Sequence, residues 1–246
     1  MTDAVTYESR DQVAIITMNK PDRMNRLDAE LVDGLHHAWK RFMAADADRV
    51  AVLAGLGRAF SAGADLNAIP HDLYRAIPSI GVPVDKPVVA AVQGWCVGGA
   101  MVLTTMCDLM VCADDAKFSY PEVKIGFSGG LISNLATRIP HKIAMELLLT
   151  GEPITAERAY EVGYVNKLVP ADQVMDAAMA YATGIAAQAP LVSRMLKRFS
   201  AEALPKGPTE VAGIARVQVE AVNASTDGDE GVAAFMEKRP PAFKGE

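Results

Sequence analysis

The chain has 246 residues, of which half are apolar and 22% are charged, and its formal net charge is −6. This length allows one large domain, or a domain with a helical appendage. The acidic balance and the lack of Lys/Arg runs argue against a surface that coats nucleic acid, but are compatible with a local basic pocket for a phosphorylated ligand. No apolar stretch is long enough to span a membrane. We therefore expect neither a nucleic-acid partner nor a membrane partner.

Cysteine usage and the start of the chain predict a reduced, cytoplasmic setting. Cys96, Cys107 and Cys112 lie in apolar surroundings without CxxC spacing, which argues against a disulfide framework or a zinc site. Residues 1–10 are polar and do not resemble a signal peptide.

The first two thirds of the chain alternate between strand and helix patterns. We expect strands at Val13–Met18, 50–54, Val88–Val92 and 108–112, each dominated by apolar residues. Asp28 is a plausible N-cap for a helix between the first two of these strands. This alternation, with uninterrupted apolar strands, favours an α/β domain with a parallel sheet.

From about Thr155 the chain is mostly helical. Thr155 is expected to cap a short helix that ends near Gly163, and a last strand follows. A helical tail after an α/β core more often serves packing or oligomerisation than chemistry. The predicted elements are a strand at 165–169 and helices at 171–187, 191–204 and 209–224.

Two features of the sequence indicate a catalytic site. Gly98 and Gly99 follow the apolar strand at Val88–Val92 and open a helical pattern, which leaves backbone N–H groups unpaired. Such groups can hold a developing oxyanion. Glu122, after a proline, could move a proton at the carbon next to a bound carbonyl, although taken alone it would be an ordinary solvated loop residue.

Six segments, in this order, resemble the crotonase (enoyl-CoA hydratase/isomerase) family over nearly the whole chain. They lie at 21–27 (PDRMNRL), 59–66 (AFSAGADL), 94–100 (GWCVGGA), 121–126 (PEVKIG), 149–166 (starting LTGEPI and ending GYVN) and 235–243 (FMEKRPPAF).

The resemblance implies a crotonase-like α/β fold, with a core of stacked ββα turns at residues 1–188. It also implies a C-terminal helical trimerisation region at 189–246 and assembly as a homotrimer or hexamer. The expected ligand is an acyl-CoA thioester. No metal and no redox cofactor are implied, since CoA is part of the substrate.

The resemblance also assigns site residues. The backbone N–H groups of Ala64 and Gly99 would hold the thioester oxygen, and Glu122 would be the catalytic acid. Lys238 would meet the CoA phosphates, although a solvated surface lysine is about equally expected there. The positions expected to bind substrate are Ala62, Asp65, Leu66, Gly98, Val102, Gly126 and Lys238.

Val102 is the main difference from the family pattern, because hydratases of the family carry a second glutamate at this position. Addition of water benefits from two carboxylates, whereas one carboxylate suffices to shuttle a proton between C2 and C4. The sequence therefore favours a 3-enoyl/2-enoyl-CoA isomerase. The alternatives are a hydratase or lyase using Glu122 and a non-standard second group, another crotonase reaction such as thioester hydrolysis, and a non-catalytic acyl-CoA-binding protein.

Two further segments differ from the family. Residues 127–134 lack the usual proline and Gly-Thr-Gln-Arg run, which predicts an acyl specificity other than the usual straight chain. The lid segment 67–86 is short and contains His71, Asp72 and Tyr74. One of these could supply a second proton-transfer group, but exposed loop residues are the commoner case.

Overall fold

The structure is a computed structural model that describes residues 4–246. A central sheet consists of β1 (Val5–Arg10), β2 (Val13–Met18), β3 (Val50–Gly55), β4 (Val88–Val92), β6 (Leu109–Ala113) and β9 (Lys167–Val169). The strands are adjacent in the order β1-β2-β3-β4-β6-β9, and all neighbours are parallel except β1 and β2. Every residue of β3 and β4 is buried, as expected for parallel strands covered on both faces.

A smaller sheet consists of β5 (Trp95–Val97), β7 (Lys117–Ser119) and β8 (Ile154–Thr155). β5 pairs parallel with β7, and β7 pairs antiparallel with β8. β4 leads directly into β5, and β6 leads into β7, so each of these turns contributes a strand to both sheets. The predicted succession of strand, strand and helix is therefore present in the core.

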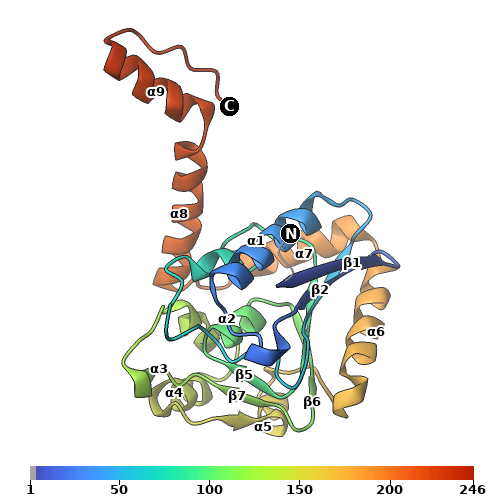
Figure 1. The fold of residues 1–246 in the computed structure, drawn as a ribbon. Coiled ribbons are helices and arrows are strands. Elements are labelled where there is room, and N and C mark those ends of the chain that lie inside the picture. Colours follow the sequence, from blue (N-terminus) through green and yellow to red (C-terminus); the bar gives the residue numbers. More distant parts are fainter. Residues whose placement is uncertain (1–3) are drawn as a thin grey trace.

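Helices surround the two sheets (Figure 1). The Asp28 side chain accepts a 3.0 Å hydrogen bond from the Leu31 N–H and caps α1, as predicted. In Figure 1, α1 and α2 lie on one side of the central sheet and α6 on the other. The helices are α1 (Ala29–Ala44), α2 (Gly99–Thr105), α3 (Glu122–Ile125), α4 (His141–Thr150), α5 (Ala156–Glu161), α6 (Val174–Ala186), α7 (Pro190–Ala203), α8 (Pro208–Asn223) and α9 (Thr226–Glu237). Short 3₁₀ helices are η1 (Pro21–Arg23), η2 (Leu73–Ala76), η3 (Leu131–Thr137) and η4 (Ala171–Gln173).

The C-terminal helices form an arm. α7 is tied to the core by a 2.7 Å ion pair between Lys197 and Asp108, whereas α8 leads α9 away from the core (Figure 1). Phe235 and Met236 of α9 are 82% and 75% exposed. Such exposed apolar residues fit the predicted self-association, which stays a prediction.

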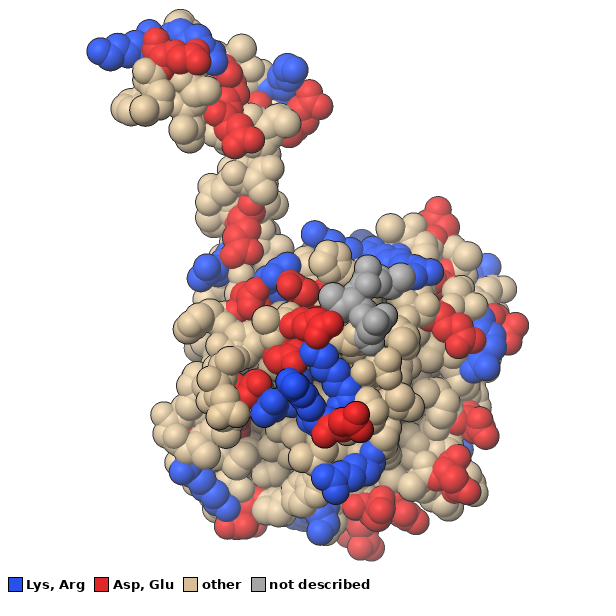
Figure 2. Space-filling view, viewed as in Figure 1, with Lys and Arg blue, Asp and Glu red and all other residues tan. Residues whose placement is uncertain are grey.

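On the face shown in Figure 2, acidic and basic side chains are interspersed over the core and the arm. Among the described residues, no helix is long and apolar enough to cross a membrane.

Gly213 sets how closely α8 approaches the core. A Cβ at this position would lie 2.8 Å from Cγ2 of Ile80, a buried and β-branched side chain. Alanine normally favours a helix over glycine by up to about 1 kcal/mol, but overpacking costs about 1–3 kcal/mol. We expect Gly213→Ala to lower the free energy of unfolding by about 1 kcal/mol, measured by urea denaturation. Gly184→Ala in α6, where a Cβ would meet no atom of the described residues within 4 Å, is the matched control and should not destabilise the protein.

Candidate active site

Two glycine-containing segments predicted to act together lie side by side. The Ser61 N–H donates to the Trp95 carbonyl, and the Val97 N–H donates to the Ser61 carbonyl, both at 3.1 Å. Gly63 has φ +82°, and a Cβ there would lie 2.6 Å from the Val97 carbonyl oxygen. Only glycine fits this contact without a shift of the backbone. The segment around Gly63 is thus held directly against the turn that precedes α2.

The backbone N–H groups of Ala64 and Gly99 are available for a ligand. Hydrogen bonds to Leu27 use the Gly63 carbonyl and the Asp65 N–H, so the N–H of Ala64, between them, points away from Leu27. Gly99 is the first residue of α2, where a helix provides no acceptor for the N–H. Among the described residues no hydrogen-bond acceptor is recorded for either group, and both residues line the same cavity.

The Glu122 side chain lies next to the turn that precedes α2. Glu122 is the first residue of α3 rather than a loop residue. A Cβ at Gly98 would lie only 2.7 Å from Glu122 Oε1, so the carboxyl group is directly next to the residue that precedes Gly99. Glu122 Oε2 is buried and has no hydrogen-bond partner among the described residues. An unpartnered buried carboxyl oxygen is costly unless a ligand uses it.

Burial raises the pKa of Glu122 from 4.5 to about 7, and a hydrogen bond from its own backbone N–H opposes this shift. Loss of hydration disfavours the charged form of a carboxyl group. A carboxyl group with a pKa near neutrality can both accept and return a proton at physiological pH.

If ionised Glu122 is the base, kcat/KM should rise about tenfold per pH unit at low pH and level off above a midpoint near pH 7. The measurement is initial rate against pH at low substrate concentration. The same substrate in the Glu122→Gln variant should lack this midpoint. A wild-type profile that is flat between about pH 5.5 and 8.5 would contradict the assignment.

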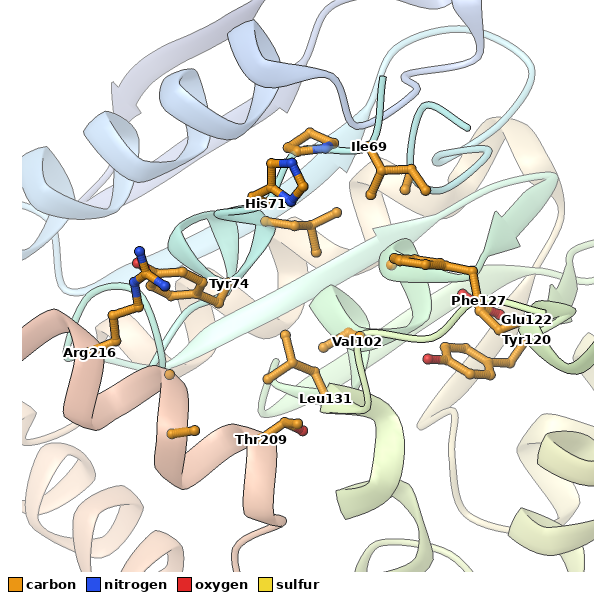
Figure 3. Close-up of a pocket in the computed structure, with 17 residues that line it drawn as sticks. Ile69, His71, Tyr74, Val102, Tyr120, Glu122, Phe127, Leu131, Thr209 and Arg216 are labelled. Carbon is orange, nitrogen blue, oxygen red and sulfur yellow. The ribbon is translucent and has the colours of Figure 1, made fainter. Parts of the chain in front are cut away.

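The cavity beside Glu122 has a volume of about 370 Å³ (Figure 3). Val102, from α2, is buried and lines it, so the position expected to carry a second glutamate presents only methyl groups. Among the described residues that line this cavity, Glu122 is the one carboxylate.

Part of the cavity wall comes from α8, which the sequence analysis did not assign to the site. Thr209, Ala212, Gly213 and Arg216 line the cavity. Their i, i+3, i+4, i+7 spacing places them on one face of a helix, and this pattern of small residues was the available signal. The region expected to serve packing or oligomerisation thus also shapes the site. The lid segment 67–86 and the segment 127–134, both noted in the sequence, also contribute to the lining, through Ile69, Pro70, Leu73, Phe127, Gly129 and Leu131. Tyr120 lines the cavity as well, and the sequence did not indicate this residue.

Of the remaining predicted positions, Ala62, Leu66 and Gly98 line an adjoining hollow of about 420 Å³ that also contacts Ala64 and Glu122. Gly126 lines a further hollow beside Glu122.

Two predicted positions lie outside these hollows. Asp65 is buried, pairs with Arg26 at 3.2 Å and accepts a hydrogen bond from the Asn67 N–H, which fits a structural role. Lys238 follows the last residue of α9, on the arm that Figure 1 shows extending from the core. In this single chain the structure does not bring Lys238 to the site, and its role stays a prediction.

The three polar residues of the lid segment differ in position. His71 is exposed and lines the cavity. Tyr74 also lines it, but its hydroxyl donates a 2.7 Å hydrogen bond to Glu220. Asp72 pairs with Arg75 at 2.8 Å and is not among the lining residues. Of the three, only His71 presents an ionisable group to the cavity without a recorded partner among the described residues.

Comparisons with known proteins identify the family of the chain. The family model described as Enoyl-CoA hydratase/isomerase matches residues 8–246. (E)-Benzylidenesuccinyl-CoA hydratase from Thauera aromatica is 35% identical over 257 residues, covering 98% of this chain and 99% of that protein.

Solved structures show the same fold. Enoyl-CoA hydratase from Mycobacterium tuberculosis H37Rv has a TM-score of 0.77 at 36% identity, and carnitinyl-CoA hydratase from Mycobacterium avium has 0.76 at 32%, each covering 100% of both chains. The predicted crotonase-like fold is thereby confirmed. The chain belongs to the enoyl-CoA hydratase/isomerase family and is an enzyme of the lyase or isomerase type.

Proposed function

We propose that the protein acts on an acyl-CoA thioester by proton transfer through a single carboxylate, Glu122. In this proposal the N–H groups of Ala64 and Gly99 bind the thioester oxygen and stabilise an enolate. One such donor contributes roughly 3 kcal/mol to transition-state stabilisation in other enzymes. The observation that carries the proposal is the buried Oε2 of Glu122, which has no hydrogen-bond partner among the described residues, in a cavity where Val102 takes the place of a second acid.

The reaction this arrangement favours is conversion of a 3-enoyl thioester to the 2-enoyl thioester. Glu122 removes a proton from C2, and the electron pair delocalises over C2–C4 and the thioester oxygen. The protonated carboxyl group then returns a proton to C4, and the double bond moves to C2–C3. No water is added, and no cofactor is needed beyond the CoA that the substrate carries.

Hydration of a 2-enoyl thioester is the second candidate. The relatives named above are hydratases, and His71 lines the cavity without a recorded partner among the described residues. In that reaction one group activates water at C3 while another protonates C2. Glu122 would do one of these tasks and His71 the other.

Paired 2-enoyl-CoA and 3-enoyl-CoA substrates in ¹⁸O-labelled water distinguish the two reactions by mass spectrometry. Migration of the double bond without ¹⁸O incorporation supports the isomerase. A product that has gained one molecule of labelled water supports hydration, and loss of that product in His71→Ala would assign the second group. Release of free CoA would instead indicate thioester hydrolysis.

Assembly as a homotrimer or hexamer and a cytoplasmic location also belong to this proposal. The exposed apolar side chains of α9 support self-association, which sedimentation at several protein concentrations would measure.

A further inference from the structure

The end of the cavity remote from Glu122 is polar. Figure 3 places Glu122 and Phe127 at one end of the cavity and Tyr74 and Arg216 at the other. The walls between these ends include the apolar side chains of Val102 and Leu131 (Figure 3). If a thioester has its carbonyl oxygen on the N–H groups of Ala64 and Gly99 and its CoA part in the adjoining hollow beside Glu122, its acyl chain runs along this apolar passage toward a cation.

Arg216 is positioned there by specific contacts. Gly213, one helical turn earlier, lets α8 approach the core closely, with no Cβ to meet Ile80. The guanidinium carbon of Arg216 lies 6.0 Å from the centroid of the Tyr74 ring. Arg216 Nε and the Tyr74 hydroxyl both donate to Oε1 of Glu220, at 2.9 and 2.7 Å. Glu220 thus orients both side chains.

The two terminal nitrogens of the Arg216 guanidinium group remain available to a ligand. No acceptor for Nη1 or Nη2 of Arg216 is recorded among the described residues. Glu220 is not among the residues that line the cavity, whereas Arg216 is. A guanidinium group presents a planar fork of N–H donors that matches a carboxylate. A purely hydrocarbon acyl chain would gain nothing from these donors.

We propose that the preferred substrate is an acyl-CoA whose acyl chain carries a second carboxylate at its far end, and that Arg216 binds this carboxylate. This inference rests on the proposed function, because it assumes that the thioester lies at Glu122. Arg216 contributes through Nη1 and Nη2, while Glu220 holds Nε and Tyr74 supports one face of the group.

The test compares two enoyl-CoA substrates of equal chain length, one ending in a carboxylate and the other in its methyl ester. The measured quantity is the ratio of kcat/KM for the acid to kcat/KM for the ester. For an exposed charge-assisted contact we expect a wild-type ratio of about ten, which falls to about one or below in Arg216→Gln. Arg216→Gln should raise KM for the acid and leave kcat largely unchanged, since the contact is remote from the reacting carbons.

Arg158→Gln is the matched control. Arg158 is also an exposed helical arginine paired with a nearby glutamate, but it lies in α5 and lines none of the hollows described above. In Arg158→Gln, the ratio of kcat/KM for the acid to kcat/KM for the ester should equal that of the wild type. A wild-type ratio of one or less, or an unchanged ratio in Arg216→Gln, would overturn the inference. Failure of the proposed function is distinguishable, because neither substrate would then show turnover that depends on Glu122.

Discussion

Glu122→Gln is expected to lower kcat by about 10²–10⁴-fold, the usual contribution of a general acid–base group. Glutamine has nearly the same shape but cannot take or return a proton at neutral pH. Binding of the acyl-CoA should be largely retained, because the cavity walls and the N–H groups of Ala64 and Gly99 are unchanged. Steady-state kinetics and isothermal titration with a substrate or product measure the two effects separately.

A folding control follows from the pKa of Glu122, which burial raises from 4.5 in the unfolded chain to about 7 in the folded protein. A carboxyl group with a raised folded pKa makes the protein less stable as pH rises through this window, because the folded state disfavours the ion. Glutamine stays neutral and avoids this cost. The melting temperature of Glu122→Gln should therefore exceed that of the wild type at about pH 8, and the difference should shrink toward about pH 4. A folded variant with wild-type kcat would contradict the catalytic role.

Gly98→Ala should have the second-largest effect. Gly98 has φ +55° and ψ −119°, a conformation that costs an L-residue about 1–3 kcal/mol, and the added Cβ would lie 2.7 Å from Glu122 Oε1. The carboxyl group must move, and a displacement of about 1 Å can cost 10²-fold in rate. We expect kcat/KM to fall about 10²-fold and the free energy of unfolding to fall by about 1–3 kcal/mol.

Gly163→Ala separates the effect of backbone strain from the effect of contact with Glu122. Gly163 also has a positive φ, +80°, but a Cβ there would meet none of the described residues' atoms within 4 Å. This variant should lose stability while kcat/KM stays within about twofold of the wild type. Equal loss of activity in both alanine variants would mean that backbone strain, rather than contact with Glu122, explains the result for Gly98.

The sequence predicted those features that depend on local patterns. Uninterrupted apolar runs marked β2, β3 and β4, and Asp28 and Thr155 marked the starts of α1 and α5 through side-chain caps. The pairing of the segments around Gly63 and Gly98 came from the family resemblance. A distant contact of this kind has no local signature.

The features that were missed depend on tertiary contacts. In β1, Val5 is buried and Tyr7 is half-buried against the core, but the other residues are exposed. Pairing with β2 stabilises this segment, which alone reads as polar. α9 contains Gly228 and Gly231, which disfavour a helix, but Ser225 caps it. The role of Arg216 required the packing of α8 on the core, because its position in the sequence does not indicate which residues it faces.

Transfer of solvent deuterium to the acyl chain would show whether Glu122 moves the proton. The wild type and Glu122→Gln would be incubated with a 3-enoyl-CoA in D₂O, and deuterium content and double-bond position followed by mass spectrometry. We expect Glu122→Gln, although folded and able to bind the thioester, to show at least about 10²-fold slower exchange and migration than the wild type. Exchange or migration at the wild-type rate in that variant would show that another group transfers the proton.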